Sequence, residues 1–157
     1  MGREIRKVPP NWDHPKYDPQ DVKHGWQHNS YKPLMQGYAA KATEFLEMAN
    51  ENGLQEAVEW FGQAPDKNDY VPDWPEGTAT WFQVYETVSE GTPVTPPFAT
   101  KEELVEYLVA HGDAWSQKRG EGGFSRKAAE SFVEDGWAPS FVIDNGKIIV
   151  GIESASR

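Results

Sequence analysis

The sequence predicts an α+β protein in which a small antiparallel sheet is packed by about four helices and preceded by an extended arm. Three observations lead to this fold class. Four segments place apolar residues at helical spacing, residues 78–88 are rich in aromatic and β-branched residues, and residues 140–152 hold two apolar runs around an Asn-Gly pair. A chain of 157 residues fits one domain, so we expect an arm over residues 1–35 and a single α+β domain over residues 36–157.

The arm lacks helical or strand periodicity and contains five prolines, which disfavour a helix: Pro9, Pro10, Pro15, Pro19 and Pro33. Its four large rings, Trp12, Tyr17, Trp26 and Tyr31, argue against a free tail. Burying each ring contributes about 1.5–3 kcal/mol, against an ordering cost of about 1–2 kcal/mol per residue. We therefore expect a marginally docked arm, with Trp12 and Trp26 as anchors on the same chain or on a partner, and a core that folds without residues 1–30.

Residues 38–52 and 54–61 are expected to form two helices joined at Gly53, as a helical hairpin or one bent helix. The expected buried stripes are Ala39, Ala42, Leu46 and Ala49 with Phe45 beside them, then Leu54, Ala57, Val58 and Phe61. Residues 63–77 follow as a loop rich in proline and acids.

Residues 78–88 are predicted to be a central strand, because Phe82, Val84 and Val88 lie on one face and Trp81 and Tyr85 on the other. Two helices follow. The first begins at Thr100, with Glu103 completing a capping box, and ends at Gly112; the second is capped by Ser125 and ends at Gly136.

The hairpin at residues 140–152 is the clearest local signal in the chain. Asn145-Gly146 is a preferred pair for a type I′ turn, which places Asp144 opposite Lys147 and Ile143 opposite Ile148. A hairpin alone is marginal in water, so we expect it to join the 78–88 strand in one sheet with helices on one side.

The charge is acidic and uneven. The net charge is −10, and residues 36–157 hold nine Lys and Arg against 21 Asp and Glu. Such a body repels nucleic acid and anionic membranes and attracts basic partners. The expected partner is a protein with a basic, nucleic-acid-binding surface. It would face four acids of the 63–77 loop: Asp66, Asp69, Asp73 and Glu76. The pattern leaves the oligomeric state open.

No motif points to a metal, a cofactor or a recognisable class of enzyme. The chain has no cysteine, and its histidine group, His14, His24 and His28, lacks the glutamate and the helical setting of a zinc site. The acidic loop does not follow the EF-hand pattern. The alternative is an enzyme of an unrecognised class, in which Glu86 on the predicted strand is a partly buried carboxylate that acts as acid or base. The favoured interpretation is that Glu86 is paired with a base or exposed at the strand end.

Two blocks carry a resemblance: residues 2–15, GREIRKVPPNWDHP, and residues 81–100, WFQVYETVSEGTPVTPPFAT. They are similar to segments of uncharacterised phage and prophage accessory proteins, as are residues 136–140 and the closing hairpin. Residues 36–76 take no part in the likeness. The resemblance implies a viral protein working in the bacterial host cytoplasm, and no catalytic residue can be carried over from it. We expect stoichiometric inhibition of a host defence effector, as an anti-CRISPR protein does, with a virion structural or assembly protein as the alternative.

Overall fold

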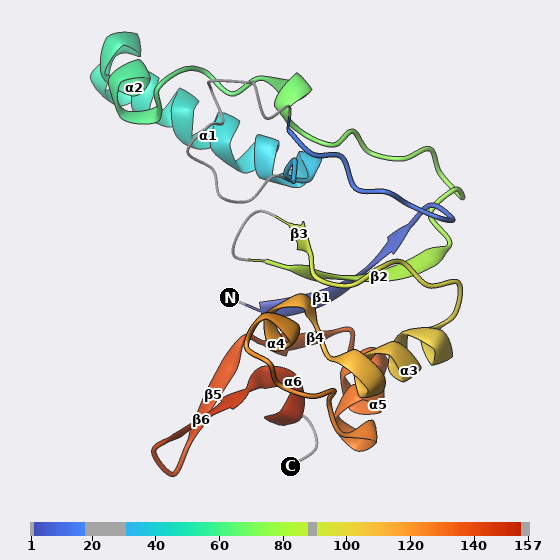
Figure 1. The fold of residues 1–157 in the computed structure, drawn as a ribbon. Helices are drawn as coiled ribbons and strands as arrows, with labels where there is room; N and C mark the ends of the chain where they lie inside the picture. Colours follow the sequence, from blue (N-terminus) through green and yellow to red (C-terminus); the bar gives the residue numbers. More distant parts are fainter. Residues whose placement is uncertain (1, 18–30, 88–90, 155–157) are drawn as a thin grey trace. The chain divides into compact units, whose positions relative to one another are not determined.

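The computed structural model describes residues 2–17, 31–87 and 91–154, and it confirms the α+β class. The chain forms two compact units (Figure 1). Unit 1 combines residues 1–13 with residues 74–157, and unit 2 holds residues 14–73. Within the described residues, no helix is both long enough and apolar enough to cross a membrane.

Unit 1 is built on a four-stranded antiparallel sheet in the order β3-β2-β1-β4. Its strands are β1 (Gly2–Val8), β2 (Trp81–Glu86), β3 (Thr92–Pro93) and β4 (Trp137–Pro139). As predicted, β2 is central, with β1 on one side and β3 on the other. Pairing of β1 with β2 places Arg3 opposite Glu86 and Ile5 opposite Val84.

Strand β1 is the main departure from the expected architecture, because residues 2–8 lie inside the sheet and not on a marginally docked arm. The close approach of β1 to β4 requires glycine at position 2, where a Cβ atom would lie 2.6 Å from the carbonyl oxygen of Ala138. The segment has only two large apolar residues, Ile5 and Val8, and four charged ones. Its strand character therefore depends on partners more than 70 residues away.

Helices cover one face of this sheet (Figure 1). They are α3 (Lys101–His111), α4 (Ala114–Lys118) and α5 (Arg126–Asp135). The predicted capping box is present at Thr100 and Glu103, and Ser125 caps α5. The core joins Val84 of β2 to Leu104 and Leu108 of α3 and Phe132 of α5. Helix α4 was not predicted, because five residues are too few to show helical periodicity.

The predicted hairpin is confirmed as β5 (Phe141–Asp144) and β6 (Lys147–Val150), with Ile143 opposite Ile148 and Asp144 opposite Lys147. Asn145 and Gly146 both have positive φ, as a type I′ turn requires. The expected pairing of this hairpin with β2 is wrong: β5 and β6 form a sheet of their own. Both edges of β2 are already paired, by β1 and β3, and the short helix α6 (Gly151–Ser154) follows the hairpin.

Unit 2 contains α1 (Met35–Asn52), α2 (Leu54–Phe61) and a 3-10 turn, η2 (Lys67–Asp69). Of the two expected arrangements, a helical hairpin and one bent helix, the structure has the hairpin, and its join lies at Gly53 as predicted. The predicted buried stripes are wrong in part: Phe45 and Ala57 are buried, whereas Leu46, Leu54 and Val58 are exposed. Two antiparallel helices bury only the side on which they meet, and here the rings of Phe45 and Phe61 meet there, with centroids 5.9 Å apart.

Candidate functional site

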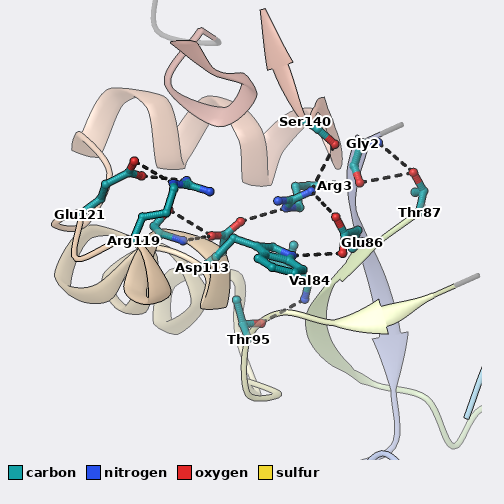
Figure 2. A network of polar contacts seen from close by, with 12 residues as sticks. Gly2, Arg3, Val84, Glu86, Thr87, Thr95, Asp113, Arg119, Glu121 and Ser140 are labelled. Atoms are coloured by element: carbon teal, nitrogen blue, oxygen red, sulfur yellow. Dashed lines mark hydrogen bonds and ion pairs between the residues drawn. The ribbon is translucent and has the colours of Figure 1, made fainter. Parts of the chain in front are cut away.

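Arg3 lies at the centre of a buried polar network in unit 1 (Figure 2). Its Nε donates to Oδ2 of Asp113 at 2.9 Å. Its Nη1 lies 3.3 Å from both the Oε1 of Glu86 and the Oγ of Ser140. One guanidinium therefore connects β1 to β2, to the start of α4 and to the residue that precedes the hairpin.

Asp113 is the most deeply buried acid of this network, with 1% of its surface exposed. Its Oδ1 caps α4 by accepting hydrogen bonds from the backbone N and the Oγ of Ser116, at 2.8 and 3.0 Å. A buried carboxylate requires both a counter-charge and hydrogen-bond donors. Arg3 supplies the counter-charge, and Arg3 and Ser116 supply the hydrogen-bond donors.

Glu86 is paired with a base, as favoured from the sequence. Its Oε1 faces Arg3, and its Oε2 accepts a hydrogen bond from Nε1 of Trp115 at 3.0 Å. Both carboxylate oxygens of Glu86 are therefore engaged by donors of the protein itself. The guanidinium of Arg3 also lies between Glu86 and Asp113 (Figure 2). This geometry is that of a structural ion cluster.

The other face of the sheet carries Tyr85, which is fully buried. Its hydroxyl donates to Oε1 of Gln83 at 2.9 Å. Burial raises the pKa of Tyr85 far above the ordinary tyrosine value, and a hydrogen bond with Trp12 and the positive charge of Arg6 oppose that rise. The Trp12 ring also packs edge-on against Trp74, with centroids 4.9 Å apart. Trp12 is thus anchored within its own unit, and Trp26 lies outside the described residues.

The four acids predicted to bind a partner do not form one cluster in a single unit. Asp66, Asp69 and Asp73 belong to unit 2, and Glu76 belongs to unit 1. Asp66 caps η2 by accepting from the backbone N of Asn68 at 2.9 Å, and it remains exposed. Asp73 and Glu76 are exposed as well, whereas Asp69 is half-buried.

Of the three histidines in the group, the structure describes only His14. His14 is buried, its Nε2 lies 2.7 Å from the carbonyl oxygen of Lys32, and its ring packs edge-on against Tyr31. His24 and His28 lie outside the described residues. In the part of the chain that the structure describes, three or more potential metal ligands nowhere lie together.

The helical hairpin of unit 2 exposes large apolar side chains between acids. We call Leu46, Leu54, Val58 and Trp60 the α1–α2 exposed set; Trp60 is 74% and Leu54 is 64% exposed. Leu54 and Val58 lie one turn apart on the same side of α2. The two helices carry one base, Lys41, and five exposed glutamates: Glu44, Glu47, Glu51, Glu56 and Glu59.

The β5–β6 hairpin of unit 1 exposes a second apolar surface. Phe141, Ile143 and Ile148 lie on the same face, since Ile143 faces Ile148 and strand residues alternate between faces. Ile148 is 76% and Ile143 is 66% exposed. We call these three residues the hairpin apolar face.

A groove of about 380 Å³ lies between α3 and α5. Val105 and Val133 line it together with charged side chains. Arg126 holds Glu106 in a two-pronged contact of 2.7 and 3.1 Å, which lowers the pKa of Glu106 and raises that of Arg126. The groove charges are thus partly neutralised by one another.

Sequence reasoning did not identify Arg3, Asp113 or Ser140. Asp113 had a usable signal, since an acid three residues before Ser116 fits a helix N-cap. Arg3 had none, because its partners are 83, 110 and 137 residues away. Comparison with protein-family models, with curated proteins and with solved structures finds no match for this chain.

Proposed function

We propose that this chain is an acidic binding protein that inhibits a host protein by forming a stoichiometric complex. The observation that carries the proposal is the α1–α2 exposed set, four large apolar side chains among five glutamates. Interfaces draw most of their affinity from a few buried aromatic and aliphatic anchors. Charges around the anchors select the partner and accelerate association.

The partner that suits this surface has an apolar pocket with a basic rim. Trp60 and Leu54 supply the anchors, and the glutamates of both helices oppose lysine and arginine on the partner. Asp66, Asp69 and Asp73 add to the negative charge of the same unit. Proteins that bind nucleic acid carry such basic surfaces, because they neutralise phosphates.

The finer form of the proposal names a phage-encoded inhibitor of a bacterial defence effector such as a CRISPR complex, acting in the host cytoplasm. It rests on the resemblance of residues 2–15 and 81–100 to phage accessory proteins. The acidic charge agrees with it, since an acidic surface can occupy a groove that otherwise holds nucleic acid.

The test is a plaque assay in bacteria whose CRISPR system targets the challenging phage. Expression of the chain should restore plaques. The double variant Leu54→Ala/Trp60→Ala should reduce inhibition by at least about tenfold, as loss of anchor residues does at interfaces. Reversing Asp66, Asp69 and Asp73 to lysine should do the same, while Glu134→Lys, a reversal at an exposed residue of α5, should retain full inhibition.

Two outcomes would contradict the proposal. One is full inhibition by both the Leu54→Ala/Trp60→Ala variant and the triple aspartate reversal, which would exclude this surface as the binding site. The other is detection of the chain at a fixed copy number in purified phage particles by mass spectrometry, which would support the virion protein instead.

A further inference from the structure

The two sheets of unit 1 differ in how their edges are closed. The outer strands of the four-stranded sheet are short and contain proline: β3 is Thr92–Pro93, and β4 ends at Pro139. Short strands and proline prevent an edge from pairing with another chain. Strands β5 and β6 contain no proline, and among the described residues they pair only with each other.

The hairpin also lacks cover over most of one face, where only Val150 is partly buried against the core of unit 1. It extends away from α3 and α5 in Figure 1. The exposed side chains at its centre, Ile143 and Ile148, are direct cross-strand partners. A two-stranded hairpin with a bare apolar face is marginal in water, and an exposed apolar surface of this kind marks an interaction site.

The local charge indicates what covers this face. Residues 141–150 contain one acid and one base, Asp144 and Lys147, which are opposite each other in the register. The surface is therefore neutral in a chain of net charge −10. A basic partner therefore gains no electrostatic attraction at this surface. A second copy of the chain is repelled by the acids elsewhere on the molecule, but it meets no net negative charge on this face.

We infer that two copies of the chain associate through their hairpin apolar faces. The contact is isologous, with Ile143, Ile148 and Phe141 of one copy against the same residues of the other around a twofold axis. The two small sheets pack face to face, about 10 Å apart. Three large side chains per copy are far fewer than the roughly 20–30 residues of a stable interface, so the dimer is weak and depends on concentration.

Analytical ultracentrifugation of the full chain tests this directly. The unmodified protein should shift from monomer to dimer as its concentration rises towards about 1 mM, the weak end of specific association. Ile148→Lys should weaken dimerisation at least tenfold, since it places two like charges at the axis. The control Lys127→Ala changes an exposed residue of α5 and should dimerise normally. A monomer at every concentration, or an equal dimer in Ile148→Lys, would overturn the inference.

Cysteine trapping provides a second test, and it does not depend on loss of folding. The chain has no cysteine of its own, so an introduced cysteine can form a disulfide only with the same residue of another copy. Under mild oxidation Ile148→Cys should form a reducible covalent dimer. Lys127→Cys at the same concentration should form several-fold less. Equal yields would mean random collision and would refute the contact. A third outcome would also refute the dimer: the protein stays monomeric, and its Ile148→Lys variant loses inhibition in the plaque assay. The hairpin apolar face would then bind another protein.

Discussion

The four-stranded sheet and the β5–β6 hairpin of unit 1 are both antiparallel, yet they are stabilised in opposite ways. The sheet joins strands from both ends of the unit, and a buried arginine holds it to α4. The hairpin consists of consecutive residues around one turn and leaves Ile143 and Ile148 exposed. Distant strands depend on buried side-chain contacts, whereas a local turn can specify a pairing with little burial.

Removing residues 1–8 should have the largest effect of the changes considered, and it should affect the four-stranded sheet more than the hairpin. The deletion takes a central strand out of the sheet, leaves the β2 edge unpaired and removes the counter-charge of Asp113. We expect unit 1 to lose its cooperative thermal transition, measured by near-ultraviolet circular dichroism. This replaces the sequence-based expectation that residues 1–30 are dispensable, and a truncated protein with a normal transition would restore that expectation.

Arg3→Ala should be the most damaging single substitution. It removes one partner of a buried ion pair and leaves the carboxyl group of Asp113 without it, which costs about 3–5 kcal/mol of unfolding free energy. Lys7→Ala on the same strand changes an exposed side chain and should cost less than about 0.5 kcal/mol. Urea denaturation measures both. Equal effects would mean that Arg3 acts only through strand formation.

High pH should weaken the sheet through Tyr85. Its pKa is raised in the folded state, so the unfolded chain releases the proton first as the pH rises. The stability from the neutral hydroxyl is complete below the ordinary tyrosine pKa of about 10 and falls by up to about 1.4 kcal/mol per pH unit above it. Urea denaturation between pH 9 and 11 should therefore show a steeper decline than in Tyr85→Phe. Parallel curves would show that Tyr85 ionises without penalty.

Gly146→Ala should have the smallest and most local effect. Gly146 has a φ of 77°, a conformation that costs a residue with a Cβ roughly 1 kcal/mol. Amide exchange should accelerate in β5 and β6 and stay unchanged in β1 and β2. Equal acceleration in both sheets would show that hairpin and sheet unfold as one element.

The sequence by itself determined the elements whose signals lie within a few residues. The Asn145-Gly146 turn and its register, the capping box at Thr100 and Glu103 and the join of α1 to α2 were all predicted and are present. Their physical causes are backbone conformation and nearby hydrogen bonds, which a short window of residues contains. The α+β class follows from the same local patterns.

Only the tertiary structure decided what those elements meet. Residues 2–8 form a strand because β2 and β4 pair with them, and Arg3 is buried because Asp113 and Glu86 neutralise it. Leu54 and Val58 were predicted as core and are exposed, because helical periodicity reports an apolar side of a helix and not what covers it. Burial and charge pairing depend on residues far apart in the chain, so the candidate binding surfaces emerged only when the fold was known.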